Sequence, residues 1–230
     1  MTVDMDVMIK AIDVNKEYRR AGAIIRALAD VNLTIKSGEF IIVQGPTGCG
    51  KSTLLNVLSG LDFPDSGKII FDGENIARAT EDRLARLRRM KIGFVFQDFN
   101  LIRTLTALEN VESVLWPTVL RSSEIEDRAI AALRDVNLLE RKDHYPVQLS
   151  GGEKQKCGLA RGIIHRPRVI LADEPTGNLD PQSETEIMDL LKKINKDSET
   201  TVIVVTHREK LASYGDKIVR MKDGRITNVK

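Results

Sequence analysis

The chain has 230 residues, enough to bury the hydrophobic core of one large domain. Its 35 lysines and arginines nearly balance 33 aspartates and glutamates, so it lacks the global basic field that gathers nucleic acid, and no nucleic-acid partner is expected. Its apolar runs fall well short of the roughly 18 residues of a membrane span, and its two cysteines do not suggest a disulfide framework. These properties predict a cytosolic protein, for which any membrane role comes through a partner.

The first part of the chain predicts an antiparallel sheet. Apolar and polar residues alternate over 7–14 and again over 29–35, and the apolar run 40–43 follows after a turn. Residues 16–22 predict a polar loop between the first two strands. Its aromatic residue, Tyr18, is either a side chain that stacks on a nucleotide base or an ordinary surface tyrosine, and the sequence leaves both readings open.

A glycine-rich loop follows the third strand and carries the strongest signal in the chain. Its spacing, G-x-x-x-x-G-K-S, is typical of a phosphate-binding loop, in which backbone N–H groups and a helix N-terminus hold an anion. Lys51 is expected to reach the β- and γ-phosphates, and Ser52 to hold Mg²⁺. A thiol within this loop also predicts inhibition by thiol reagents, with protection by ATP. The loop consists of Gly45, Pro46, Thr47, Gly48, Cys49, Gly50, Lys51, Ser52 and Thr53.

A short strand and a helical segment follow in the middle of the chain. Residues 92–96 predict a buried strand, and Gln97 comes directly after it, where an open α/β sheet places ligand contacts. From about residue 101 to residue 145 the pattern is helical. The second helix predicted there, over 123–137, begins with a capping box formed by Ser123 and Glu126.

Small residues at the start of the next helix predict a second anion-binding site. Two glycines and a serine at a helix N-terminus present free N–H groups and a hydroxyl, although a purely structural glycine-capped helix is the alternative. Gly158 and Gly162 interrupt this helix, and each is expected to cost about 0.5 to 1 kcal/mol relative to alanine if it is exposed. The site consists of Ser150, Gly151, Gly152 and Glu153.

Two further strands are followed by residues that can bind a metal ion or contact a phosphate. The buried strand 169–172 leads into Asp173 and Glu174, 122 positions after Lys51. A carboxylate there is the expected second half of a phosphate-loop nucleotidase and binds Mg²⁺, while Glu174 is placed to polarise water. The strand 200–206 leads into His207, a candidate for a γ-phosphate contact.

Asp180 and Pro181 open the helix between those strands. Aspartate is a favoured N-cap residue, and proline is favoured at the first helical position. Asp180 is therefore either a cap alone or a cap that also belongs to the site.

These motifs, taken in order, resemble those of the nucleotide-binding subunit of ABC transporters over essentially the whole chain. Residues 99–111 and 176–180 are similar to the branch that contains macrolide exporters, lipoprotein-release ATPases and the cell-division ATPase. Glu153 departs from the glutamine that is commoner in the family's signature sequence. The resemblance names 45–53 as the Walker A loop, Gln97 as the Q-loop residue, 149–153 as the signature, 169–173 as the Walker B strand, Glu174 as the catalytic glutamate, 178–180 as the D-loop, His207 as the switch histidine and Tyr18 as the aromatic residue that stacks on adenine.

The resemblance implies an α/β fold with a phosphate-loop NTPase core, an antiparallel β subdomain and an inserted helical subdomain. The chain would be a single ATP-binding domain, with an α/β body over 1–100 and 146–230 and a helical subdomain over about 101–145. It implies hydrolysis of ATP with Mg²⁺ as cofactor. Catalysis is then assigned to Glu174, His207, Lys51 and Gln97, the metal to Ser52, Gln97 and Asp173, and nucleotide contacts to Tyr18, Asp180 and the residues of both glycine-rich sites.

The resemblance also implies partners. ABC subunits form head-to-tail homodimers, in which Ser150, Gly151 and Gly152 of one subunit close on the ATP held by the other. An integral membrane permease would recruit the pair to the cytoplasmic face of the cell membrane, for export, lipoprotein release or force transmission. The alternative is a soluble ABC ATPase of DNA repair or translation, but those tend to have two cassettes or a long coiled-coil insertion, whereas Lys51 and Ser150 are 99 positions apart.

Overall fold

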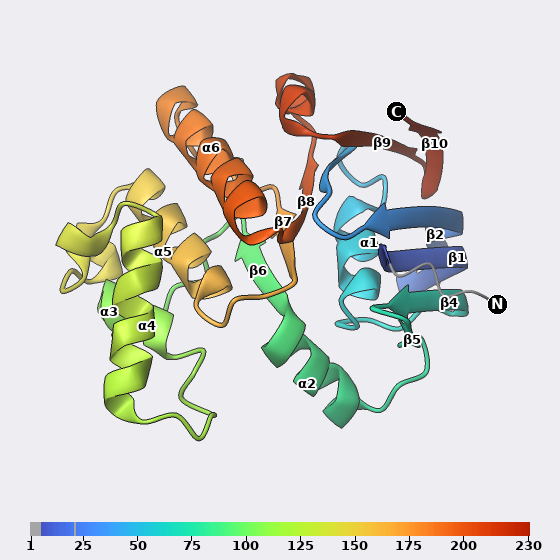
Figure 1. Ribbon diagram of the computed structural model, residues 1–230. Helices are drawn as coiled ribbons and strands as arrows, with labels where there is room; N and C mark the ends of the chain where they lie inside the picture. Colours follow the sequence, from blue (N-terminus) through green and yellow to red (C-terminus); the bar gives the residue numbers. More distant parts are fainter. Residues whose placement is uncertain (1–5, 21) are drawn as a thin grey trace.

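The computed structural model describes residues 6–20 and 22–230, which form two β-sheets and the helices around them (Figure 1). A four-stranded antiparallel sheet has the order β2-β1-β4-β5, and a six-stranded sheet has the order β10-β9-β3-β8-β7-β6. The strands are β1 (Val7–Arg20), β2 (Ala23–Lys36), β3 (Phe40–Gln44), β4 (Ser66–Phe71), β5 (Glu74–Asn75), β6 (Ile92–Phe96), β7 (Val169–Asp173), β8 (Thr201–Thr206), β9 (Lys217–Lys222) and β10 (Arg225–Val229).

Helices cover both faces of the larger sheet. In Figure 1, α3, α4 and α5 gather at one end of the molecule and the antiparallel sheet lies at the other. Within the described part of the chain, no helix is both long enough and apolar enough to cross a membrane. The helices are α1 (Lys51–Leu58), α2 (Glu81–Lys91), α3 (Ala107–Glu112), α4 (Ser122–Asp135), α5 (Gly151–Ile163) and α6 (Pro181–Ser198), with short 3-10 helices at Leu139–Arg141, Pro146–Gln148 and Glu209–Tyr214.

The central strands are parallel and buried on both faces. Every residue of β3 and β8 is buried, as expected for parallel strands covered by helices on both sides. Alternate side chains enter opposite cores. Phe40 and Ile42 pack in a cluster that includes residues of α3 to α6, while Ile41 and Val43 pack in a cluster that includes α1, α2 and the antiparallel sheet. The larger sheet therefore separates two hydrophobic cores.

Three predicted details of local structure are wrong. The strand predicted over 40–43 does not continue the antiparallel region: it is β3, which pairs parallel with β8 and β9 in the larger sheet. Residues 16–20 are not a loop but the end of β1, paired with β2 from Lys16 opposite Leu28 onward. Register shifts in this pair interrupt the alternation of apolar and polar residues, which hid the strand from the pattern.

The capping box predicted at the start of α4 is also absent. The helix begins at Ser122, one residue before the predicted cap, and Arg121 stands at the N-cap position without a side-chain hydrogen bond. Capping boxes form instead at the starts of α3, between Thr106 and Glu109, and of α5, between Ser150 and Glu153. The same sequence pattern therefore caps a helix only where the preceding chain turns at the right residue.

Gly162 of α5 lies against β6, and Gly158 lies against the segment that follows this strand. Gly158 and Gly162 are both buried, so the exposed setting assumed for their predicted cost is wrong. A Cβ added at Gly93 of β6 would lie 2.1 Å from the carbonyl oxygen of Gly162, whereas a Cβ at Gly158 would meet its nearest atom, the Phe99 carbonyl oxygen, at an ordinary 3.5 Å. Only glycine at position 93 permits this backbone-to-backbone contact between α5 and β6.

We expect Gly93→Ala to reduce the free energy of unfolding by about 1 to 3 kcal/mol, because two backbones must separate to admit a methyl group. Chemical denaturation measures this difference. Gly158→Ala is the matched control, and it is expected to leave stability unchanged or raise it by up to about 1 kcal/mol through helix propensity. Equal stability of the Gly93 variant and the parent protein would contradict the packing argument.

Candidate functional site

The phosphate loop connects β3 to α1 and is packed tightly against neighbouring strands. Gly50, at the N-cap position of α1, has a φ of 103°, and a Cβ there would lie 2.2 Å from the Ala27 carbonyl oxygen. A Cβ at Gly45 would lie 2.2 Å from the Met221 carbonyl oxygen. Glycine at these two positions lets β2 and β9 approach the loop, which fixes its shape and leaves its N–H groups available to an anion.

Lys51, the first residue of α1, is buried inside the loop that it follows. Its Nζ donates hydrogen bonds to the carbonyl oxygens of Gly45 at 2.9 Å and Pro46 at 3.0 Å. The same nitrogen lies 3.9 Å from Oε1 of Glu174. The cation is therefore held against the loop backbone, close to the carboxylate that follows β7.

Ser52 and Asp173 come from distant parts of the chain and meet in the site. Ser52 Oγ donates a hydrogen bond of 3.1 Å to Asp173 Oδ1. Burial raises the pKa of the Asp173 carboxyl, and the hydrogen bond from Ser52 opposes this only partly. Burial of a carboxylate therefore makes a cation at this point favourable.

These two oxygen donors fit Mg²⁺, which commonly takes one or two protein oxygens and completes its shell with phosphate and water. Within residues 6–20 and 22–230, no group of three or more His, Cys, Asp or Glu side chains forms a metal site without a nucleotide.

Glu174 and His207 lie side by side at the ends of neighbouring strands. His207 Nδ1 is 3.0 Å from Glu174 Oε1. The Glu174 side chain is only 15% exposed, whereas that of His207 is 50% exposed. Glu174 has a left-handed backbone with a φ of 46°, a conformation that costs about 1 to 3 kcal/mol for a non-glycine residue and that is concentrated at functional sites.

Gln97 is engaged by the loop after β7, not by the predicted metal ligands. Its Nε2 donates to Asn178 Oδ1 at 3.2 Å, and Asn178 Nδ2 donates in turn to Asp98 Oδ1 at 3.1 Å. Neither Ser52 nor Asp173 is a hydrogen-bond partner of Gln97. Asn178 was named only as part of the D-loop, and an asparagine in a turn gives no sign of which distant amide it will pair with.

These groups surround one open cleft of about 680 Å³. Tyr18 is one of its lining residues, and the Tyr18 hydroxyl donates to Asp62 Oδ2 at 2.7 Å. Ile25 and Ala27 of β2 line it as well, and the strand pattern did not distinguish them as site residues. The lining residues are Tyr18, Ile25, Ala27, Thr47, Gly48, Gly50, Lys51, Ser52, Thr53, Phe96, Gln97, Asp98, Asn100, Asp173, Glu174 and His207.

The second predicted anion site does not line this cleft. Ser150 Oγ accepts the Glu153 N–H at 3.2 Å, and Glu153 Oε2 accepts the Ser150 N–H at 2.8 Å. Arg141 Nε donates to the other oxygen of Glu153 at 2.9 Å. The hydrogen bond from the Ser150 N–H and then that from Arg141 lower the pKa of Glu153. The Glu153 carboxylate therefore interacts with groups at and near the start of its own helix. Residues 150–153 therefore lie outside the cleft formed by this chain.

Two other predicted residues have mainly local partners. Asp180 Oδ1 accepts the N–H groups of Gln182 and Ser183, each at 3.0 Å, so that it caps α6. Cys49 is 5% exposed, and its Sγ would lie 2.7 Å from a Cβ at Gly45. The thiol is therefore buried within the folded loop, and its modification by thiol reagents stays a prediction.

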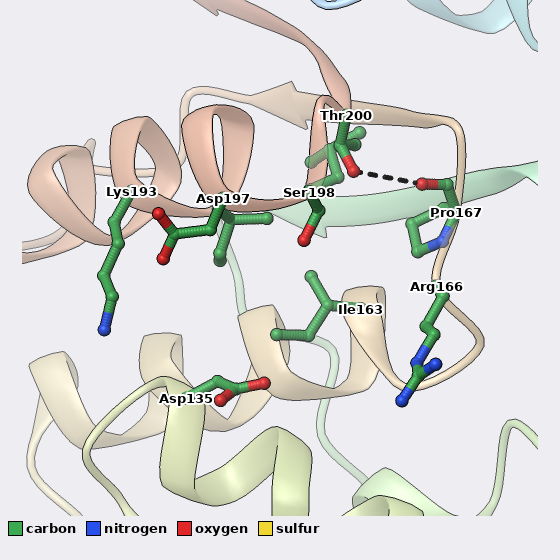
Figure 2. A pocket seen from close by; sticks show the side chains of 10 residues that line it. Asp135, Ile163, Arg166, Pro167, Lys193, Asp197, Ser198 and Thr200 are labelled. Carbon is green, nitrogen blue, oxygen red and sulfur yellow. Dashed lines mark hydrogen bonds between the residues drawn. The ribbon is translucent and has the colours of Figure 1, made fainter.

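A separate cavity of about 480 Å³ lies between the ends of α4, α5 and α6 (Figure 2). Arg166 and Lys193 lie on opposite sides of it, as do Asp135 and Asp197, so its charges are mixed. No predicted site residue lines it. This cavity is therefore separate from the cleft that the predicted phosphate-binding residues line.

Comparison with known proteins identifies the family. The family model of the ABC transporter matches residues 28–177. The chain is 46% identical over 223 residues to the uncharacterized ABC transporter ATP-binding protein MJ0796 of Methanocaldococcus jannaschii, and the match covers 95% of each protein. A solved dimeric structure of the ATP-binding cassette MJ0796 in a post-hydrolysis state, bound to ADP and Pi, is similar with a TM-score of 0.90 and 43% identity, covering 97% of this chain and 98% of that one.

Two further relatives carry more specific names. The lipoprotein-releasing system ATP-binding protein LolD of Geobacter metallireducens is 40% identical over 222 residues, which cover 96% of this chain and 99% of LolD. The macrolide export ATP-binding/permease protein MacB of Brucella abortus is 42% identical over 219 residues, which cover 95% of this chain but 34% of MacB. The predicted ABC ATPase fold and its relation to the macrolide-export and lipoprotein-release proteins are confirmed, and the soluble alternative is not favoured. The chain belongs to the ABC transporter family, as an ATP-binding subunit that hydrolyses ATP.

Proposed function

We propose that this ATPase subunit works as a head-to-tail pair that drives a membrane permease. One observation carries the proposal: the chain has two glycine-rich helix starts suited to anions, and only the one at Gly50 lines its own nucleotide cleft. The second, at Ser150, would contact the ATP that is bound in the cleft of another copy. The dimeric structure of MJ0796 supports pairing, since it covers 97% of this chain.

In the proposed site, the phosphate loop and Lys51 bind the phosphates of ATP, and Tyr18 stacks on the base. Ser52 and Asp173 hold Mg²⁺, with Gln97 as a further ligand that exchanges its hydrogen bond with Asn178 for the metal. When bound, Mg²⁺ neutralises charge that develops on the phosphate oxygens. The 3.1 Å contact between Ser52 and Asp173 supports this assignment, because it brings the two proposed oxygen ligands together.

Hydrolysis is assigned to Glu174 and His207. Glu174 accepts a proton from the attacking water, and His207 orients the γ-phosphate. Their 3.0 Å contact supports a shared role, and the largely buried carboxylate is close to Lys51. The signature residues 150–152 of the partner copy would complete the site from the open side of the cleft, and Asp180 would lie at the same junction.

The permease is proposed to dock next to Gln97. A groove of about 350 Å³ lies there between the segment after β6 and the residues around the start of α5. Exposed apolar side chains flank it, including Ile102 at 45% and Val147 at 88% exposed. The docked subunit would lie on the cytoplasmic face of the membrane, in an export, lipoprotein-release or force-transmitting system. The helical subdomain over about 101–145 and the α/β body would be the two parts joined at this groove.

Replacing Glu174 by glutamine is expected to lower ATP turnover by about 10² to 10⁴-fold, because the amide cannot accept a proton from water. Steady-state ATPase assays with the full chain measure it. Glu199→Gln is the matched control, since Glu199 also has a left-handed backbone, with a φ of 51°, but lies outside the cleft. Near-parental turnover of the Glu174 variant would remove this residue from its role.

The same Glu174 variant is expected to accumulate as an ATP-bound dimer, because ATP persists between the two copies. Size-exclusion chromatography with and without ATP and Mg²⁺ tests this. Adding Ser150→Arg should return the protein to a monomer, since a bulky side chain there blocks the partner's phosphate. A Glu174 variant that stays monomeric with ATP would contradict the shared site.

Asp173→Asn is expected to abolish Mg²⁺-dependent turnover but to raise the melting temperature at neutral pH. Because burial raises the pKa of Asp173, its contribution to stability is present below the ordinary aspartate pKa and is lost as pH rises through the raised value. The advantage of the amide should therefore shrink in acid, near about pH 3.9. Calorimetry at the two pH values tests this, with the exposed Asp143→Asn as control. A neutral-pH melting temperature below the parental one would contradict it.

Arg103→Glu is expected to reduce the fraction of the protein that sediments with membranes of the source cell, because Arg103 lines the groove next to Gln97. Basal ATPase activity should be unchanged, since Arg103 does not line the nucleotide cleft. Arg89→Glu, an exposed charge reversal on α2, is the matched control. Equal membrane recovery of the two variants would contradict the placement of the permease.

A further inference from the structure

A buried carboxylate on α6 binds two cations of the segment that follows His207. Glu184 lies in the first turn of α6, and its side chain is 2% exposed. One oxygen accepts a hydrogen bond from Arg208 Nη1, and the other pairs with Lys210 Nζ. Burial acts to raise the pKa of Glu184, but the hydrogen bonds from Lys210 and Arg208 outweigh it and lower the pKa. Glu184 is therefore a charged anchor in the interior.

Only one of the two cations reaches further. Arg208 Nη2 donates a second hydrogen bond, of 3.3 Å, to the carbonyl oxygen of Gly177 in the turn after β7. A guanidinium presents its donors as a rigid fork, so one side chain can hold Glu184 and Gly177 at once. Lys210 is 61% exposed and pairs with Glu184 alone among the described residues. Both cations pair with the Glu184 carboxylate, but only Arg208 also donates a hydrogen bond to the turn at Gly177.

The turn held by Arg208 contacts two residues of the proposed catalytic machinery. The Gly177 N–H donates to the Glu174 carbonyl oxygen at 2.9 Å. A Cβ added at Gly177 would lie 2.9 Å from Gln97 Nε2, which shows how closely the turn packs on that amide. A shift of Gly177 therefore moves the surroundings of both side chains.

The backbone of Arg208 is also held by a residue of β3. Gln44, the last residue of β3 before the phosphate loop, donates from Nε2 to the Arg208 carbonyl oxygen at 3.0 Å. Arg208 also directly follows His207, which contacts Glu174 at 3.0 Å. One residue thus connects the start of the phosphate loop, the histidine and the turn after β7.

We propose that Arg208, anchored by Glu184, is a positioning residue that fixes the turn at Gly177 relative to His207, and that ATP turnover depends on it although it does not line the nucleotide cleft. This inference rests on the proposed roles of Glu174 and His207. The Glu184–Arg208 pair would then act on kcat through the geometry of those two residues rather than on nucleotide affinity.

Arg208→Lys is the sharpest test, because lysine keeps a positive charge beside Glu184 but lacks the fork that also reaches Gly177. We expect kcat for ATP to fall by about 10 to 10²-fold, the scale of a misplacement of about 1 Å, with KM changed less than about twofold. Lys210→Ala is the matched control, since it removes the other cation from the same carboxylate, and its kcat should be parental. Assays run well below both melting temperatures, which are measured alongside.

Two outcomes would overturn the inference. Parental kcat of Arg208→Lys would show that the link to Gly177 is dispensable, and an equal loss of kcat in Lys210→Ala would show that the charge on Glu184, not the fork, matters. If Arg208→Lys does not fold, Glu184→Gln keeps the volume and an acceptor while releasing the anchor, and the same fall in kcat is expected with the same control.

Glu174→Gln, assayed in parallel, separates this inference from the proposed function. A large loss of kcat in Glu174→Gln together with parental kcat in Arg208→Lys overturns the positioning role alone. Parental kcat in both variants overturns the proposed catalytic assignment as well.

Discussion

The register of the parallel strands is the constraint on which the site depends. Gln44 at the end of β3 pairs with Thr206 of β8, and Asp173 at the end of β7 pairs with Val205. These strands are buried on both faces, so a slip of one residue would move apolar side chains between two different cores. The burial that stabilises the sheet thereby brings the phosphate loop, the two acidic residues and His207 to one edge.

Residues that act where a strand ends could be predicted from the sequence. A short β-branched run followed by Asp173 or by His207 needs only local information, and parallel strands bring their carboxyl ends together. The Walker A spacing likewise reports a loop whose function lies mostly in its own backbone. For these residues, the order of elements along the chain was enough to predict that they share a cleft.

Pairings between loops could not be predicted in the same way. The hydrogen bond between Gln97 and Asn178, and the link from Arg208 to Gly177, join segments whose relative position is set by packing elsewhere. The extension of β1 through residue 20 was hidden for a related reason, because register shifts break the two-residue period that marks a strand. The start of α4 shows the same limit, since a capping pattern does not determine where the chain turns.

The contact between Gly93 and Gly162 has a mechanical consequence. Side chains between a helix and a sheet can change rotamer, but at this crossing two backbones touch directly. The strand that carries this contact ends one residue before Gln97, and the helix begins directly after Ser150. Because no side chain lies between them at this contact, β6 and α5 would move as one unit. A displacement of the end of β6 next to Gln97 would then also displace the start of α5 next to Ser150.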